Sequence, residues 1–165
     1  MRIAVKDASI LIDLAEGDLL GLWFQLKIEA HTTDLVLREV KQETQWARVS
    51  PFVDAGLLQR HTTAAEEIPA LVVFSQTHGI NLPDASGVLL ARRLQAYLLT
   101  GERRLRRAAE GGEIVTHGLL WILDQLVERE TLTRPDAAQR LERMLAAGSR
   151  LPRPECDGRL KAWRV

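Results

Sequence analysis

The stretch Val5-Lys6-Asp7-Ala8-Ser9-Ile10-Leu11-Ile12-Asp13-Leu14 decides the fold class of this 165-residue chain. Residues 1–6 form a short apolar segment typical of a β-strand, and the apolar spacing from Ala8 onward predicts a helix. Asp7 lies between the two, at the carboxyl end of the strand. Open parallel α/β sheets build their sites at that edge, so Asp7 is the first candidate site residue. Taken alone, Asp7 is equally well explained as the cap of the helix that follows.

The alternation of strand-like and helix-like segments continues along the chain. Further strands are predicted at residues 28–32, 57–62, 96–100 and 114–116. Helical spacing or helix-start signals cover residues 8–15, 19–26, 33–40, 46–55, 64–78, 83–94, 102–109, 118–127 and 135–147. This order indicates an α/β fold, with a mostly parallel sheet covered on both faces by helices. We expect one domain over residues 1–150, and residues 151–165 as a tail packed on that domain or on a partner.

Composition limits the classes of function. The chain has 22 basic and 22 acidic side chains, so its formal net charge is zero. Binding of nucleic acid would therefore rest on a local patch or on metal ions. The single Cys156 excludes an internal disulfide and a thiolate zinc cluster, and the four histidines lack ligand spacing. No secretory leader or membrane-length apolar run is visible, so we expect a cytoplasmic protein without a membrane partner.

Four carboxylates carry the functional hypothesis: Asp7, Glu39, Asp84 and Glu102. Each has an ordinary explanation alone, because acids favour helix starts and a mid-helix Glu39 commonly forms a surface ion pair. Three of the four nevertheless fall where strands end or helices begin along one sheet edge. Carboxylates are the ligands that Mg²⁺ and Mn²⁺ prefer, and without a cation they would raise one another's pKa. Their joint position favours a metal-ion site at this edge of the sheet, where a bound cation could activate a water molecule.

Together with the first stretch, four further segments resemble the PIN domain, the nuclease domain of many toxin–antitoxin toxins: Thr33–Val40, Leu82–Ser86, Leu98–Arg106 and His117–Trp121. The resemblance implies a three-layer domain with a five-stranded parallel sheet, and a Mg²⁺- or Mn²⁺-dependent ribonuclease. It also implies a small antitoxin protein as partner and a homodimer. The family's acidic quartet falls on Asp7, Glu39, Asp84 and Glu102. Position 102 departs from the usual Asp, and the extra methylene of Glu102 shifts its oxygens by roughly 1–1.5 Å.

Supporting roles are expected for Ser9 and Thr100, whose hydroxyls could contact the ligands or a phosphate. Arg103 belongs to a basic run with Arg104, Arg106 and Arg107. Such a run is either a solvated helix face or a set of phosphate contacts. The alternative function is a catalytically weakened PIN-like domain that serves as a binding or assembly module. A receiver-type signalling domain ranks behind both, because paired acids after the first strand and a Lys after the fifth are missing.

Overall fold

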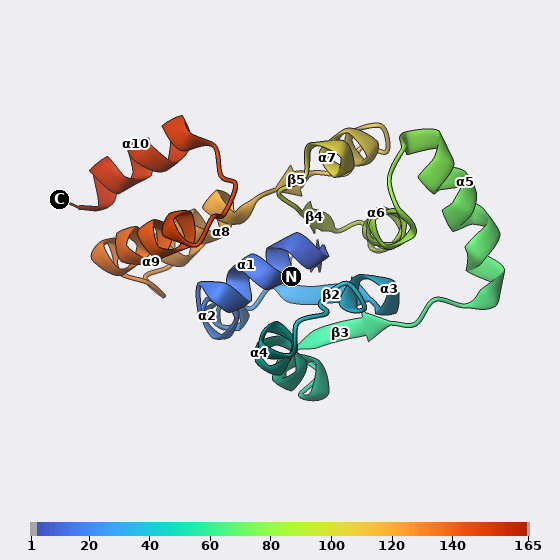
Figure 1. The fold of residues 1–165 in the computed structure, drawn as a ribbon, viewed down its shortest axis with the longest axis horizontal. Helices are drawn as coiled ribbons and strands as arrows, with labels where there is room; N and C mark the ends of the chain where they lie inside the picture. Colours follow the sequence, from blue (N-terminus) through green and yellow to red (C-terminus); the bar gives the residue numbers. More distant parts are fainter. Residues whose placement is uncertain (1–2, 165) are drawn as a thin grey trace.

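The computed structural model describes residues 3–164; Met1 and Arg2 of the predicted first strand, and Val165 of the predicted tail, lie outside them. Five strands form one sheet in the order β3-β2-β1-β4-β5, and every neighbouring pair is parallel (Figure 1). The strands are β1 (Ile3–Lys6), β2 (Glu29–Thr33), β3 (Leu58–His61), β4 (Tyr97–Leu99) and β5 (Thr116–His117). The α/β class with parallel strands, which the alternating sequence pattern predicted, is confirmed.

The strand order contains one reversal of direction. From β1 the chain builds outward through β2 and β3, and it then returns to place β4 on the other side of β1. The carboxyl ends of β1 and β4 therefore flank a topological switch point, where connections leave in opposite directions and open a crevice. Asp7 directly follows β1 there, and its amide donates to the carbonyl oxygen of Leu99 at 3.2 Å.

Helices cover both faces of the sheet, as Figure 1 shows. Alternation along β4 illustrates the division, because Leu98 belongs to one hydrophobic cluster and the next residue, Leu99, to the other. The larger cluster joins the sheet to a first group of helices: α1 (Ala8–Glu16), α2 (Leu20–Gln25), α8 (Leu119–Glu128), α9 (Arg134–Ala146) and α10 (Arg153–Trp163). The smaller joins it to a second group: α5 (Ile68–His78), α6 (Leu82–Leu94) and α7 (Arg103–Glu110).

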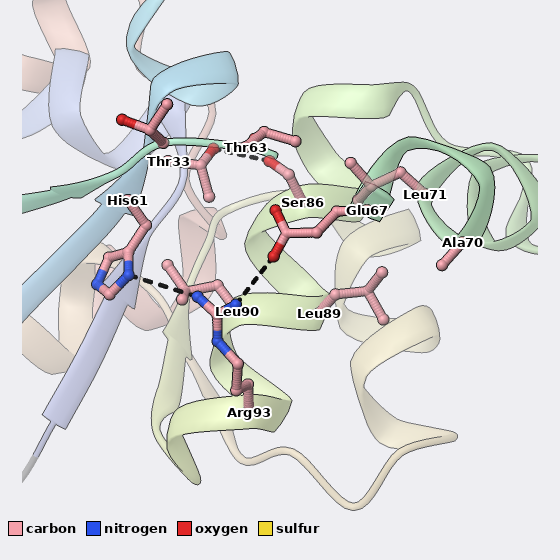
Figure 2. A pocket seen from close by; sticks show the side chains of 11 residues that line it. Thr33, His61, Thr63, Glu67, Ala70, Leu71, Ser86, Leu89, Leu90 and Arg93 are labelled. Atoms are coloured by element: carbon pink, nitrogen blue, oxygen red, sulfur yellow. Dashed lines mark hydrogen bonds and ion pairs between the residues drawn. The ribbon is translucent and has the colours of Figure 1, made fainter. Parts of the chain in front are cut away.

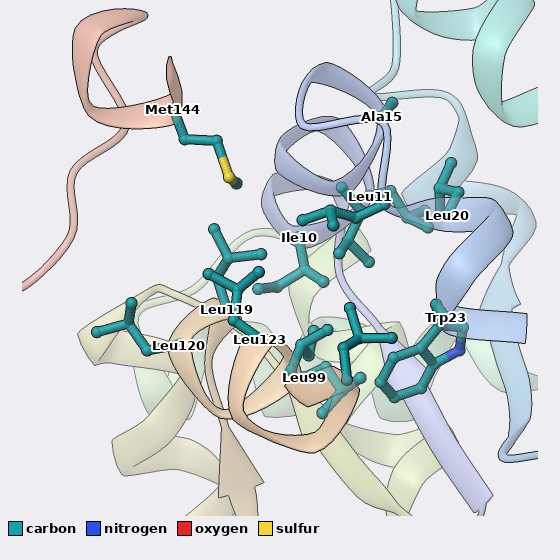
Figure 3. Close-up of a cluster of buried hydrophobic side chains, with 14 of the residues drawn as sticks. Ile10, Leu11, Ala15, Leu20, Trp23, Leu99, Leu119, Leu120, Leu123 and Met144 are labelled. Carbon is teal, nitrogen blue, oxygen red and sulfur yellow. The ribbon is translucent and has the colours of Figure 1, made fainter. Parts of the chain in front are cut away.

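The larger cluster anchors the helix that carries the first candidate residue. Ile10 and Leu11 on α1 are fully buried beside Leu99, Leu119 and Trp23 (Figure 3). Burying side chains of this size contributes roughly 1.5–3 kcal/mol each, so the position of α1 is strongly determined. Asp7, one residue before α1, is thereby held at a fixed place on the sheet edge.

Several predicted boundaries were wrong, and one of them affects a candidate site residue. The predicted helix over residues 33–40 ends early, because α3 covers only Asp34–Leu37, so Glu39 lies in the following turn and not mid-helix. The amide of Glu39 donates to the Val36 carbonyl oxygen three residues back, which tightens and ends the helix. Buried Val40 after the turn explains the false continuation of the apolar spacing.

The fifth strand begins two residues later than predicted, at Thr116. The amide of Ile114 donates to the carbonyl oxygen of Ala109 and so belongs to the end of α7, not to a strand ladder. His117, just before the predicted helix over residues 118–127, is the final residue of β5, and Gly118 is the N-cap of α8.

The carboxyl-terminal segment, expected as a tail, forms a regular helix. Its prolines are compatible with helix because Pro152 is the N-cap of α10 and Pro154 lies in its first turn, where amide donors are not needed. Cys156, Leu160 and Trp163 are buried in the larger cluster, and α10 packs on α9. The remaining elements are α4 (Glu43–Asp54) and a 3₁₀ turn at Ala65–Glu67. No helix within residues 3–164 combines the length and apolar character needed to cross a bilayer.

Candidate functional site

Asp7 uses its two carboxylate oxygens differently. Oδ1 accepts hydrogen bonds from the Ile10 amide at 2.8 Å and from the Ser9 hydroxyl at 2.9 Å, which makes Asp7 the N-cap of α1. Oδ2 is buried and has no hydrogen bond of good geometry within the described residues, although the Thr100 side chain is near enough to affect the pKa. The side chain as a whole is only 2% exposed. Capping of α1 therefore accounts for the position of Oδ1 but gives no reason for the burial of Oδ2.

Asp84 and Glu39 are positioned by a chain of hydroxyl hydrogen bonds. The Thr33 hydroxyl, at the end of β2, accepts from the Val36 amide at 3.1 Å and lies 2.7 Å from the Ser86 hydroxyl. Ser86 donates to the Pro83 carbonyl oxygen at 2.6 Å, so the Thr33 hydroxyl is the donor to Ser86. This chain ties the end of β2, which leads through α3 to Glu39, to the first turn of α6, which carries Asp84.

The pKa values show that the four candidate carboxylates interact. Burial raises the pKa of Asp7 to about 6, although the nearby Thr100 side chain and the hydrogen bonds from Ile10 and Ser9 act to lower it. Burial also raises the pKa of Asp84 to about 7, with further contributions from the charges of Glu102, Glu39 and Asp7. The pKa of Glu39 is raised by burial and then by the charge of Glu102. The fold has thus brought four acids, distant in sequence, within electrostatic range of one another.

Glu102 differs from the other three acids because its side chain is exposed and makes no capping hydrogen bond. It is the N-cap of α7. Its backbone amide donates to the buried Thr100 hydroxyl at 3.0 Å, which fixes the backbone and leaves the carboxylate unrestrained. Glu102 nevertheless contributes to the raised pKa of all three other acids. Its long side chain can therefore approach the group from the solvent side.

Comparisons with known proteins agree with this geometry. A family model described as a PIN domain matches residues 3–164, almost the full length of the chain. The chain belongs to the PIN domain family. The crystal structure of PAE2754 from Pyrobaculum aerophilum is similar to this PIN domain at a TM-score of 0.55 and 16% sequence identity. The match covers 76% of this chain and 96% of PAE2754, and at this identity it shows a shared fold. No curated protein matches the chain.

PIN domains are generally nucleases and typically use divalent metals, so the donor set must be tested against a hard cation. Two oxygens, Asp7 Oδ2 and Glu39 Oε1, are buried and lack hydrogen-bond partners within residues 3–164. Buried polar atoms without partners cost free energy, as do neighbouring like charges, and a divalent cation would remove both costs. The residues therefore fit the ion in chemistry and charge. Across the described residues, however, no three acidic, histidine or cysteine side chains are gathered as a preformed ligand set.

Two parts of this region escaped the sequence analysis. Asn81 is the N-cap of α6, accepts from the Asp84 amide at 2.8 Å, and lowers the pKa of Glu39 through its side chain. Its signal was the order Asn81-Leu82-Pro83, an N-cap followed by Pro inside the first turn. The second part is a cavity of about 190 Å³ beside α6, which the four candidate acids do not line.

Arg93, His61 and Glu67 line that cavity, and Figure 2 shows Arg93 linked to both of the others; the hydrogen bonds continue from His61 beyond the cavity to His31 and Glu29. Arg93 can only donate, so His61 Nδ1 at 3.4 Å accepts and His61 Nε2 carries the proton. His61 Nε2 then donates to His31 Nδ1 at 2.8 Å, and His31 Nε2 donates to Glu29 at 3.0 Å. Arg93 also pairs with Glu67 at 3.0 Å. In this arrangement each donor meets an acceptor from Arg93 to Glu29, and we assign this chain a structural role.

Proposed function

We propose that this PIN domain is a Mg²⁺- or Mn²⁺-dependent endoribonuclease that hydrolyses RNA phosphodiesters at Asp7, Glu39, Asp84 and Glu102. One observation carries the proposal. Asp7 Oδ2 is buried at the switch point of the sheet with no hydrogen-bond partner among residues 3–164, and it lies within electrostatic range of three further carboxylates. A purely structural carboxylate would have both oxygens satisfied.

Each residue has a separate task in this proposal. Asp7 and Asp84 would be the main cation ligands, and Glu39 and Glu102 would complete the set directly or through water. The bound cation would supply charge stabilisation for the phosphate and a water molecule of lowered pKa. Ser9 holds Asp7 Oδ1 and so orients Oδ2, and the buried Thr100 hydroxyl stabilises the ionised form of Asp7. The hydroxyl chain from Thr33 through Ser86 keeps α6, and with it Asp84, in place.

We further infer a toxin-type role, with a small antitoxin protein as partner, a homodimer and a cytoplasmic location. The likeness of the motifs to toxin PIN domains supports this role. Exposed apolar side chains support a protein partner, because Val73 on α5 is 63% exposed and Ile68 at the start of α5 is 39% exposed. Light scattering on the purified chain tests the dimer: a single monomeric species at micromolar concentration would refute it.

The alternative, a binding or assembly module, has its own observation in favour. Position 102 holds an exposed Glu, and the described residues contain no gathered ligand set. The deciding experiment is cleavage of a fluorescent RNA panel in Mn²⁺ or Mg²⁺ by the native chain, Asp7→Asn and Glu102→Asp. Metal-dependent cutting that disappears in Asp7→Asn supports the nuclease. Absence of cutting by all three folded proteins supports the module.

A further inference from the structure

A second hollow is lined by Gly101 and Arg103, the residues on either side of Glu102. It has a volume of about 400 Å³ and lies between the start of α7, β5 with the first turn of α8, and the connection from α9 to α10. Figure 1 shows α7, β5 and α8 in succession there. Gly101 lines the hollow, so it begins one residue from a proposed cation ligand. We call this hollow the arginine groove.

Four arginines line the arginine groove, and they differ in how firmly the protein itself holds them. Arg159 forms a two-point ion pair with Asp124, at 2.9 and 2.6 Å. Arg106 donates to the Thr100 carbonyl oxygen at 3.2 Å. Within residues 3–164, Arg103 and Arg150 have no ion pair, and both are exposed. Arg106 is likewise outside every ion pair of the described residues, although its guanidinium is held at Thr100, and Glu155 is the acidic side chain that lines the groove. The groove therefore presents two exposed, unpaired guanidinium groups, Arg103 from α7 and Arg150 from the α9–α10 connection.

An aromatic platform lines the same groove. The rings of His117 and Trp121 stack with centroids 4.0 Å apart and planes 8° apart, and Tyr97 meets Trp121 edge-on at 6.0 Å. His117 and Trp121 are both half-buried and both line the groove. Single-stranded nucleic acid is recognised by two features together: aromatic faces, on which bases stack, and cations, which bind the phosphates. The arginine groove has both, in the stacked rings and the two exposed guanidinium groups.

The arginines of α7 are divided between two surfaces. Arg103 and Arg106 line the arginine groove, whereas Arg104 and Arg107 line a separate hollow with His78 and Gly79. The two surfaces carry similar charge, but among the lining residues described only the first contains a tryptophan, stacked on His117, and only the first begins one residue from Glu102. This division provides a control with the same change in charge on the same helix.

We propose that the arginine groove binds the single-stranded RNA next to the cleaved bond, with one unpaired base on the Trp121–His117 platform and phosphates at Arg103 and Arg150. This inference rests on the proposed nuclease function, whose substrate it places on the surface. Stacking requires an unpaired base, so a duplex of the same sequence must bind less tightly. Arg150 lies just before α10, which gives the carboxyl-terminal region a role in substrate binding.

The test is fluorescence anisotropy with a short labelled single-stranded RNA, at several salt concentrations, with Asp7→Asn as a common background that keeps the RNA intact. The double variant Arg103→Ala/Arg150→Ala should weaken binding at least about tenfold and flatten the slope of log K against log salt by about 1.4, since each phosphate contact on a single strand contributes about 0.7. The control Arg104→Ala/Arg107→Ala should change binding less than about threefold. Equal loss in both double variants would overturn the proposal.

The platform is tested separately with Trp121→Leu, which should weaken binding by about 5- to 100-fold with an unchanged salt slope. Trp121→Phe keeps an aromatic face and should retain most of the affinity, which separates stacking from loss of packing. Equal affinity for the duplex would overturn the stacking claim. The two proposals fail independently: a chain that cuts RNA but binds it equally in both double variants keeps the nuclease and loses the groove. A chain that never cuts but binds through Arg103 and Arg150 loses the nuclease and keeps only an RNA-binding groove.

Discussion

Two polar clusters flank α6, and they differ in how well their groups are satisfied. In the chain from Arg93 through His61 and His31 to Glu29, each group that donates meets one that accepts. At the acidic edge, two buried carboxylate oxygens have no partner among the described residues, and the acids raise one another's pKa. The first arrangement is complete within the protein. The second calls for a positive charge from outside, and this contrast distinguishes the candidate site from a structural network.

A pair of aspartates shows the same contrast for one chemical group. Burial acts to raise the pKa of Asp34, but hydrogen bonds from the Thr63 hydroxyl and amide and the Leu35 amide, with the Arg38 charge, leave it lowered. The pKa of Asp84 is raised to about 7 because burial is reinforced by three negative neighbours. Environment, not residue type, therefore indicates which carboxylate is structural and which awaits a ligand.

The largest expected effect is on catalysis. Asp7→Asn removes one negative charge from the proposed cation site but keeps an oxygen that can accept from the Ile10 amide, so α1 remains capped. RNA cleavage in Mn²⁺ should fall at least about a hundredfold, the upper range for disturbing a metal ligand's surroundings. Gel analysis of labelled RNA, with circular dichroism for the fold, makes the measurement. Cleavage at the native rate would refute the role of Asp7.

A substitution in the hydrogen-bonded histidine chain should lower the free energy of unfolding. His31→Ala removes a side chain that is 4% exposed, and it takes from Glu29 and from His61 the shortest hydrogen bond of each, leaving only contacts of 3.4 Å to Gln59 and Arg93. The free energy of unfolding in urea should fall by about 2–4 kcal/mol, combining a lost side chain with poorly paired polar groups. Exposed His78 provides the control, and His78→Ala should change the free energy of unfolding by less than about 0.5 kcal/mol. A loss no larger than that of the control would show that the histidine chain is not structural.

A substitution in the acidic cluster, in contrast, should raise the free energy of unfolding. The pKa of Asp84 is about 7 in the folded chain, against an ordinary value of 3.8, so the native protein holds the proton more tightly and loses stability as pH rises from about 4 to 7. Without divalent cations, Asp84→Asn should therefore raise the free energy of unfolding at pH 8 by about 1–2 kcal/mol, after allowance for its partial exposure, and much less at pH 4.

Asp34→Asn is the matched comparison for Asp84→Asn. Because the pKa of Asp34 is lowered on folding, its ionised form stabilises the native state above the unfolded pKa, and this contribution is lost as pH falls through the folded pKa. Asp34→Asn should thus reduce stability at pH 8. Urea denaturation at pH 8 measures the free energy of unfolding of both variants. If Asp84→Asn and Asp34→Asn changed it in the same direction, the comparison would be contradicted.

The smallest effect is expected at position 102. Glu102 is the N-cap of α7 without a capping side-chain bond, and Asp is a favoured cap residue. Glu102→Asp should therefore raise the free energy of unfolding by about 0.5–1 kcal/mol in urea. The shorter side chain also restores the residue usual in the family, so cleavage should increase. Lower cleavage together with higher stability would mean that the longer Glu102 is the better ligand in this chain.

Sequence patterns predicted much of the fold because apolar spacing is local. The segment around Asp7 and Ser9 specified strand, cap and helix together, and the structure shows all three. Boundaries failed where burial continued past a helix end, as at Val40, or where an apolar residue such as Ile114 closed a helix. The sequence could not show that residues 153–163 form a buried-faced helix, because its prolines cap that helix.

The candidate site was predicted as a set of residues, and their roles there remain proposals. Position along the chain indicated Asp7 and Asp84 at the sheet edge, but it could not show that Asp7 Oδ2 lacks a partner, since that depends on packing from several elements. The link between Thr33 and Ser86 joins residues that are 53 positions apart, and sequence spacing carries no sign of it. The satisfied histidine chain was missed for the same reason.

The most direct test of the central contrast is thermal unfolding at pH 8 with increasing Mn²⁺. A cation that binds only the folded acidic edge stabilises by RT ln(1 + [Mn²⁺]/Kd), about 2.7 kcal/mol at a hundredfold excess over Kd. We expect Tm of the native chain to rise with Mn²⁺, Tm of His31→Ala to rise in parallel from a lower start, and Tm of Asp7→Asn to rise little. No rise in the native chain, or an equal rise in Asp7→Asn, would contradict a cation site at these carboxylates.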